Sequence, residues 1–143
     1  MKSIHRIAAA ILVLGAAVLA APPPVFAEVV KLTAQLVPDS GPADAGTAQG
    51  KANFSYDTDT MLLTYVVVYD HLSGPATGAD IREAPQPGSP SRIVVVFPVP
   101  ESPIGGTATL SDAQAAELLA GKFAVDVRTD ANGGGEIIGT IHR

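Results

Sequence analysis

Short segments with apolar residues at alternate positions, separated by clusters of glycine and proline, dominate this sequence after residue 27. In the segment Val29–Val37, the residues Val30, Leu32, Ala34 and Leu36 share one face. An apolar residue at every second position buries one face of an extended strand and leaves the other in water. The pattern therefore predicts short β-strands, with many of the 14 glycines and 12 prolines in the turns between them.

Six further segments have the composition of strands, because they alternate or are rich in β-branched and aromatic residues. They are Thr47–Tyr56, Met61–Leu72, Thr77–Glu83, Arg92–Phe97, Lys122–Thr129 and Glu136–His142. Met61–Leu72 and Arg92–Phe97 carry apolar residues on both faces, so we expect both to be buried inside a sheet. Pro98, Pro100 and Pro103 follow and predict a loop, since proline cannot donate to a sheet ladder.

One helix is expected near residue 115. Ser111 is a favourable N-cap, and Gln114 three residues later completes a capping box. Strong helix formers fill Ala113–Leu119, and Gly121 stands where a left-handed C-terminal cap belongs. A single short helix excludes an alternating βαβ architecture. The sequence thus predicts an all-β fold, an antiparallel Greek-key β-sandwich of seven to eight short strands with one short helix.

The first 27 residues predict an export signal. Lys2 and Arg6 form a basic region, and the uncharged run Ile7–Ala21 follows it. Pro22–Pro24 end any helix, and cleavage is expected after Ala27. The domain would then be residues 28–143, periplasmic or extracellular, with no membrane span after cleavage. An uncleaved membrane anchor is the alternative, because the uncharged stretch extends to residue 26.

Removing the signal makes the chain more acidic. It takes away two of the nine basic residues and no acidic ones, which leaves seven against fourteen and a net charge of −7. This charge disfavours nucleic acid and anionic lipid as partners. The absence of cysteine excludes disulfides, thiolate metal sites and a cysteine nucleophile.

Several segments in order resemble a known family. They read LTAQLVP, GTAQGKANFSYD, MLLTYVVVYDHLSGPAT, GADIRE, RIVVVFPV, TATLSDAQAAELLAGKFAVDVRT and GGGEIIGTI. Together they resemble the CHRD domain, a module named from chordin, from about Lys31 to Ile141, and the most specific match is Leu118–Ile141. The resemblance implies a Greek-key β-sandwich. In animal chordin these modules belong to an extracellular antagonist of growth-factor ligands, whereas bacterial members bring no chemistry to carry over.

The chain departs from the family pattern at its histidines. Members of the family commonly show His-x-His in the short fourth strand and a histidine after the V-x-V strand. Here those places read Asp80-Ile81-Arg82 and Arg128, and the remaining histidines of the domain, His71 and His142, lie elsewhere. We therefore expect no metal site and no cofactor.

Five charged residues form the candidate polar patch. Asp80 and Arg82 alternate onto one face of a strand, Asp126 and Arg128 onto one face of another, and Glu136 begins the last strand. One interpretation is a cross-strand ion-pair network that fixes strand register. The other is a recognition patch for an acidic ligand. Phe123, Val125 and Val127 are expected to face the core, whereas Ala124 joins the charged residues on the outer face.

Catalytic and metal-binding motifs find little support. Asp130, Asn132 and Glu136 weakly match a calcium loop, but Asn132-Gly133 fits a hairpin turn equally well. The sequence contains no Gly-x-Ser-x-Gly motif.

The sequence therefore predicts an exported, non-enzymatic binding or structural module, with a protein or cell-envelope component as partner. The alternative is a small periplasmic metal-binding or metal-dependent protein with a sandwich architecture like that of superoxide dismutase.

Overall fold

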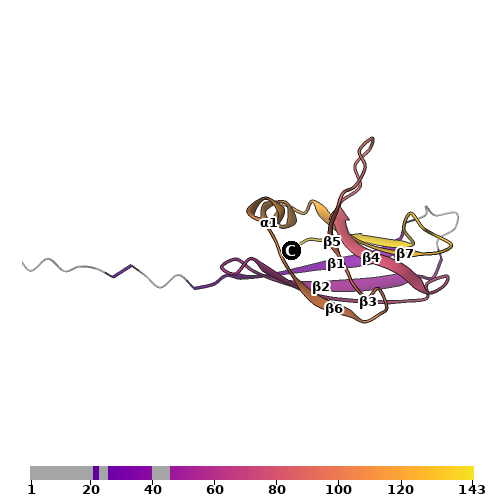
Figure 1. Cartoon of the computed structure of the whole chain (residues 1–143), viewed down its shortest axis with the longest axis horizontal. Helices are drawn as coiled ribbons and strands as arrows, with labels where there is room; N and C mark the ends of the chain where they lie inside the picture. Colours follow the sequence, from indigo (N-terminus) through magenta and orange to yellow (C-terminus); the bar gives the residue numbers. More distant parts are fainter. Residues whose placement is uncertain (1–20, 23–25, 40–45) are drawn as a thin grey trace, which may run out of the picture.

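The computed structural model describes residues 21–22, 26–39 and 46–143, and this part of the chain forms eight β-strands and one helix (Figure 1). The elements are β1 (Val29–Pro38), β2 (Gln49–Asp57), β3 (Leu62–Asp70), β4 (Ala76–Glu83), β5 (Ile93–Val96), β6 (Ile104–Thr109), α1 (Asp112–Leu119), β7 (Phe123–Thr129) and β8 (Ile137–Thr140). The predicted all-β class with one short helix is confirmed. Most of the predicted signal segment lies outside the described residues.

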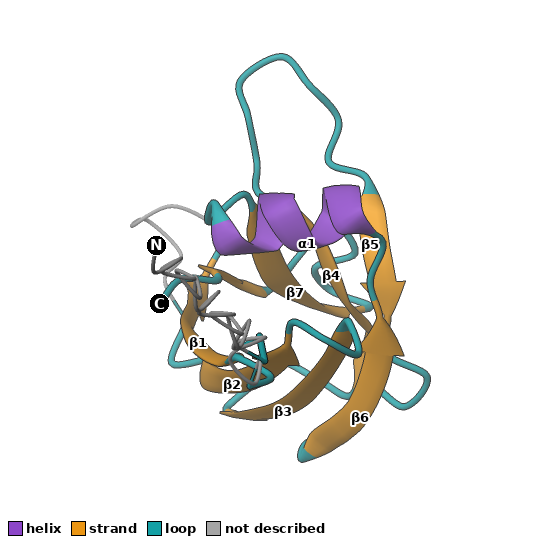
Figure 2. Cartoon of the chain, turned by 90° about the vertical axis from the view of Figure 1, so that its left-hand side faces the viewer, coloured by secondary structure: helices purple, strands orange, loops and turns teal. Residues whose placement is uncertain are grey.

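All strand pairs are antiparallel and belong to one sheet with the order β5-β4-β7-β8-β1-β2-β3-β6. β1 joins the two halves of this sheet, since it pairs with β2 as far as Leu36 and with β8 at Val37 and Pro38. The sheet curves around so that its two halves face each other (Figure 2). One continuous sheet therefore supplies both layers of the expected sandwich.

The core lies between the two halves of the sheet. It consists of the inward side chains of the strands together with two residues of α1. Its fully buried members include Leu36, Leu63, Val67, Ile81, Leu118, Phe123, Val125, Val127, Ile137 and Ile141. Phe97, just after β5, packs against Tyr65 of β3 with ring centroids 4.5 Å apart, which links the two halves.

Gly139 allows β8 to approach β1 closely. A Cβ atom at this position would overlap the backbone carbonyl of Gln35 in β1. A little further on, Thr33 and His142 exchange two backbone hydrogen bonds of 2.8 and 2.9 Å. The glycine and this bridge hold the last residues of the chain against the strand that joins the two halves.

The predicted helix and its caps are confirmed. The Ser111 side chain accepts a hydrogen bond from the Gln114 amide, and the Gln114 side chain accepts one from the Ser111 amide. Gly121 has φ +73°, as expected for a left-handed residue after the helix. Ala115 and Leu118 are its buried residues. Within the described part of the chain, no helix has both the length and the hydropathy of a membrane span.

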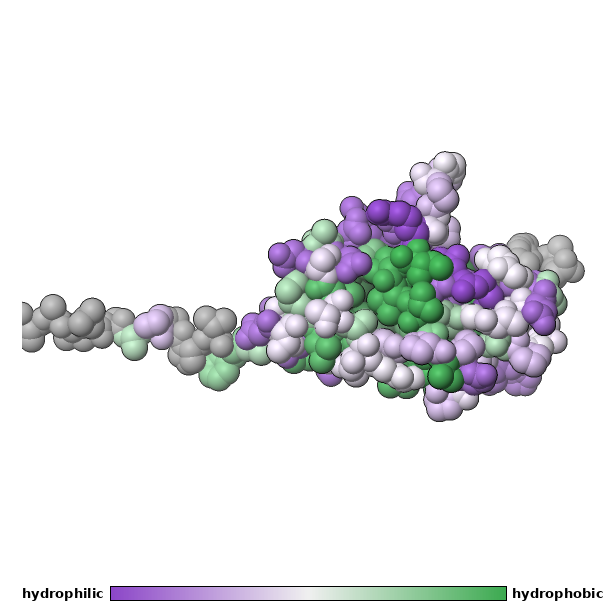
Figure 3. Space-filling model, viewed as in Figure 1, coloured by the Kyte–Doolittle hydropathy of each residue, from purple (hydrophilic) through white to green (hydrophobic). Residues whose placement is uncertain are grey.

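Three strand predictions need correction. β3 has a neighbour on each side, β2 and β6, but it is next to the edge of the sheet, and Val66 and Val68 on its outer face are 47% and 44% exposed. β5 is an edge strand instead of a buried one, and its exposed apolar side chains form a hydrophobic patch (Figure 3). β6, which pairs with β3, was not predicted as a strand, and it begins directly after the loop expected at Pro98–Pro103. β4 lies inside the sheet, between β5 and β7.

Candidate functional site

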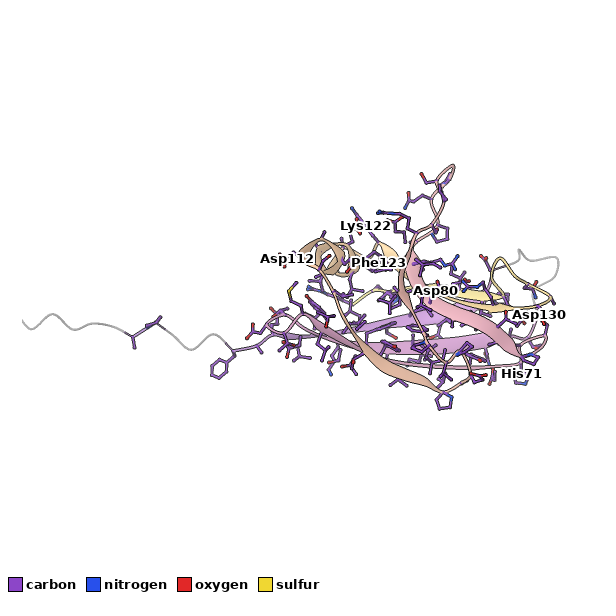
Figure 4. All side chains as sticks on the ribbon, viewed as in Figure 1. His71, Asp80, Asp112, Lys122, Phe123 and Asp130 are labelled. Atoms are coloured by element: carbon purple, nitrogen blue, oxygen red, sulfur yellow. The ribbon has the colours of Figure 1, made fainter. Side chains whose placement is uncertain are left out.

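Strands β4 and β7 bring four of the five predicted site residues together. Asp80 lies directly opposite Asp126 in the register of the two strands. Arg82 and Arg128 lie two residues further along their own strands, and side chains two apart share a face. We refer to Asp80, Arg82, Asp126 and Arg128 as the Asp–Arg quartet. Figure 4 shows Asp80 away from His71 and Asp130, which lie at one end of the molecule.

Each arginine of the Asp–Arg quartet contacts both aspartates. Arg82 places Nε 2.8 Å from Oδ1 of Asp80 and Nη2 3.0 Å from its Oδ2, a bidentate pair, and Nη2 also lies 2.9 Å from Oδ2 of Asp126. Arg128 places Nη1 2.5 Å from Oδ2 of Asp80 and 3.0 Å from Oδ2 of Asp126. Such charge-assisted pairs are stronger than neutral hydrogen bonds.

The two aspartates are buried beneath the arginines. Asp80 and Asp126 are 0% and 1% exposed, whereas the side chains of Arg82 and Arg128 are 17% and 22% exposed. The expectation that Asp126 and Ala124 face water is therefore wrong, since β7 is buried on both faces. Gly78 leaves room for the Arg128 side chain above the aspartates, because a Cβ atom there would lie 2.6 Å from Nη2 of Arg128.

One carboxylate oxygen of the Asp–Arg quartet is left over. Oδ1 of Asp126 is buried and has no hydrogen-bond partner in the described part of the chain. It lies beside Gly135, where a Cβ atom would be 2.6 Å from this oxygen and 2.9 Å from Oδ2 of Asp39. Burial raises the pKa of Asp126, and this effect outweighs the opposite influence of Arg82 and Arg128.

Glu136 belongs to a different group of residues. Its carboxylate accepts hydrogen bonds from the Ser73 amide at 2.6 Å, the Ser73 hydroxyl at 2.7 Å and the Thr129 hydroxyl at 2.5 Å. The Asn132 amide adds a fourth at 3.3 Å. We call these four residues the Glu136 cluster. It ties the turn between β3 and β4 to the turn between β7 and β8.

The hydrogen bonds also set the charge of the Glu136 cluster. Burial alone would raise the pKa of Glu136, but the bonds from Thr129, Ser73 and Asn132 together lower it. The carboxylate is therefore ionised at neutral pH, and both of its oxygens accept hydrogen bonds within the protein. The sequence placed Glu136 in the same patch as the arginines because it could not show which way the last turn directs this side chain.

The loop after β7 has the geometry of a turn. The backbones of Thr129 and Asn132 exchange hydrogen bonds of 3.4 and 3.1 Å, so Asp130 and Ala131 lie at the centre of this turn, and the Gly135 amide then donates to the Asn132 carbonyl at 3.1 Å. The loop therefore turns in two steps, and Asn132-Gly133 is not the centre of a two-residue hairpin turn. His71 lies 3.0 Å from Asp70 at the surface. In the part that the structure describes, no group of three or more His, Cys, Asp or Glu side chains is placed to hold a metal ion.

The two arginines retain donors after binding the aspartates. Arg82 uses Nε and Nη2, and Arg128 uses Nη1, so the remaining N–H groups are available to water or to a ligand. The Asp–Arg quartet is formally neutral, and its carboxylates are shielded from solvent. This arrangement is better suited to holding β4 and β7 together than to binding and releasing a ligand.

The structure adds a surface feature that motif reasoning missed. A hollow of about 320 Å³ lies on the outer face of β1, β2 and β3. It is lined by Gln35, Gln49, Lys51, Val68 and Asp70, with Gly50 and Tyr69 between them. The available signal was the set of polar residues at the outward positions of these alternating strands.

Comparison with known proteins gives one match. A family model described as CHRD domain matches residues 29–141, a range that contains all eight strands and the helix. Searches of curated proteins and of solved structures found no match.

Proposed function

The chain belongs to the CHRD domain family, and we propose that it is an exported, non-enzymatic binding or structural module that associates with a protein or another component of the cell envelope. The observation that carries this proposal is the extent of the match, which includes every strand of the fold. We therefore assign the binding or structural role to the whole domain and not to one segment of it.

The geometry of the Asp–Arg quartet supports a structural role for these four residues. An acidic ligand that paired with both guanidinium groups would have to displace the two buried carboxylates that already pair with them. Removing one partner from a buried ion pair leaves an uncompensated charge, which is strongly unfavourable. We therefore assign the Asp–Arg quartet to holding β4 and β7 in register, and look for the binding surface elsewhere.

Export rests on the order of charges and apolar residues at the N-terminus. Lys2 and Arg6 precede the uncharged run, and the small residue Ala27 follows the prolines. The test is to produce the full chain in a bacterial host, fractionate the cells and measure the intact mass. The expected result is a periplasmic or secreted protein that begins at Glu28. A full-length protein that stays in the cytoplasm would contradict export, and one held in the membrane fraction would indicate an anchor.

A further inference from the structure

The outer face of β1, β2, β3 and β6 is polar and carries two lysines. This face is the solvent side of the lower layer in Figure 1, and we call it the outer face. Strand register arranges its three central rows as Lys31, Ser55, Thr64 and Thr107, then Thr33, Asn53, Val66 and Gly105, then Gln35, Lys51 and Val68. These rows contain no carboxylate. Asp57 and Asp70 lie in the rows at either end.

The two lysines of the outer face differ from three arginines of the domain in their pairing. Arg82, Arg92 and Arg128 are all in ion pairs with carboxylates. Lys31 and Lys51 form no ion pair with any described residue, and Lys31 donates only to the Ser55 hydroxyl at 3.1 Å. A chain with a clear excess of acidic residues thus presents free ammonium groups on a face whose central rows are free of acid.

Lys51 lies at the hollow described above. The side chains of Gln35, Gln49 and Lys51 supply amide and ammonium groups around it, and Val68 adds an apolar wall. Because Gly50 and Tyr69 lie in the intervening, inward-facing row, their backbone lies between the two rows of outward side chains. The hollow therefore runs across the strands.

We propose that this hollow binds a carboxylated sugar unit of an acidic polysaccharide, with Lys51 on the carboxylate and Gln35 and Gln49 on hydroxyl groups. The inference rests on the proposed binding function and names its class of partner. Amides hydrogen-bond to hydroxyl groups as both donors and acceptors, and an ammonium complements a carboxylate. Neighbouring strands are about 4.8 Å apart, close to the length of one hexose unit, so a sugar chain that crosses from β1 to β2 passes Gln35 and then Lys51, with Val68 of β3 beyond them.

The chemistry of the outer face disfavours other partners. Single-stranded nucleic acid needs aromatic side chains for stacking, and the three central rows contain none. Insertion into lipid needs large apolar side chains, but only Val66 and Val68 are apolar in these rows. Protein interfaces are enriched in aromatic residues, methionine and arginine, which are also missing from them.

The test is titration calorimetry of the exported form with polygalacturonate, in low salt. Neutral dextran, phosphatidylglycerol vesicles and duplex DNA are the comparison ligands. Saturable binding to polygalacturonate alone is expected, and it should weaken as salt is added. Equal binding to vesicles or DNA would overturn the proposal, because charge alone would then explain the result.

Matched lysine variants locate the contact. Lys51→Gln should weaken binding about tenfold, and Lys31→Gln should weaken it less because Lys31 lies outside the hollow. Lys122→Gln removes the same charge away from the outer face, beside Glu83 and Glu117, and should leave affinity unchanged. Equal losses in all three variants would overturn a specific site.

A fourth variant tests the opposite sign. Asp70 is at the edge of the hollow and repels a carboxylate, so Asp70→Asn should strengthen binding. Unchanged melting temperatures would show that the variants fold normally. If polygalacturonate fails to bind but the protein still sediments with purified cell envelope, this inference is wrong while the proposed binding function stands. If both measurements are negative, both are wrong.

Discussion

At the scale of single residues, the Asp–Arg quartet shows how two buried like charges are tolerated. Asp80 and Asp126 face each other across β4 and β7, where two carboxylates would repel strongly in a medium of low polarity. The two guanidiniums lie over both carboxylates and offset this repulsion. Alternation in the sequence predicted which residues share a face. It could not predict the depth of burial, which depends on the arginine stems and on the lack of a side chain at Gly78.

Removing the arginines tests this network. Arg82→Ala and Arg128→Ala should each lower the free energy of unfolding by about 2 kcal/mol, because buried carboxylates lose a partner. The double variant should differ from the sum by more than about 0.5 kcal/mol, as expected for residues that share partners. Chemical denaturation measures all three values. Arg92→Ala, at an exposed ion pair with Glu83, is the control and should change the free energy of unfolding little. Additive, near-zero changes in this free energy for Arg82→Ala and Arg128→Ala would contradict the network.

Gly135 is the next residue-scale test. It has φ +140°, a conformation that other residues rarely adopt, and its missing side chain leaves room for the carboxylates of Asp126 and Asp39. Gly135→Ala should lower stability by about 1–3 kcal/mol. Gly134→Ala is a matched control one residue away, where nothing lies within 4 Å, and should change stability by no more than about 0.5 kcal/mol. Thermal unfolding of the two variants would contradict this account if they behaved alike.

The Glu136 cluster predicts a pH dependence with a definite sign. The pKa of Glu136 is below its usual value of 4.5 in the folded protein, so the unfolded chain takes up this proton first as pH falls. The contribution of the carboxylate to stability is thus complete above about pH 4.5 and is lost as pH falls through the folded pKa. Glu136→Gln should be less stable at neutral pH and lose less stability on acidification, as measured by unfolding at pH 7 and below. Parallel curves for the two proteins would contradict this role.

At the scale of elements, most strands and the helix were predicted well from the sequence. The failures share one cause, which is that strand pairing depends on residues far away in the sequence. The caps of α1 are local, so Ser111, Gln114 and Gly121 could be recognised from spacing alone. β6 contains Gly105 and Gly106, which have low strand propensity, and it is formed by pairing with β3. Which strand lies at an edge is also a property of the sheet, so hydrophobicity placed β5 inside it by mistake.

The apolar edge at β5 leads to a prediction about this element. Val96 is 64% exposed, and the strand pairs only with β4. Uncharged edge strands favour association, and a lysine on the edge reduces it. Val96→Lys should change the free energy of unfolding by no more than about 0.5 kcal/mol and raise the concentration at which the protein aggregates. Light scattering measures the aggregation, and chemical denaturation measures the free energy of unfolding. A large loss of stability in Val96→Lys would contradict the prediction, because it would show that this side chain is packed against the core. The same change at the buried Val67 should unfold the domain.

At the scale of the whole molecule, β1 decides the architecture. It pairs with β2 from Val29 to Leu36 along one edge and with the C-terminal residues at Thr33, Val37 and Pro38 along the other, so two layers become one curved sheet. The sequence of β1 alternates regularly and contains no sign that this strand has partners along both edges. The absence of a side chain at Gly139 permits the close approach of β8 to β1, but this is visible only once the two strands are placed together. The candidate site was predicted in the same partial way, with four residues correctly grouped and Glu136 placed apart by a turn.

The central claim is that the domain acts by binding through a surface, while the Asp–Arg quartet maintains the fold. The most direct measurement is an equilibrium co-sedimentation isotherm of the exported form with purified cell envelope. It should be made at a temperature where wild type, Arg82→Ala and Arg128→Ala are all folded. We predict saturable binding with the same affinity for all three proteins. Absence of saturable binding by the wild type, or its loss in the folded arginine variants, would contradict the account.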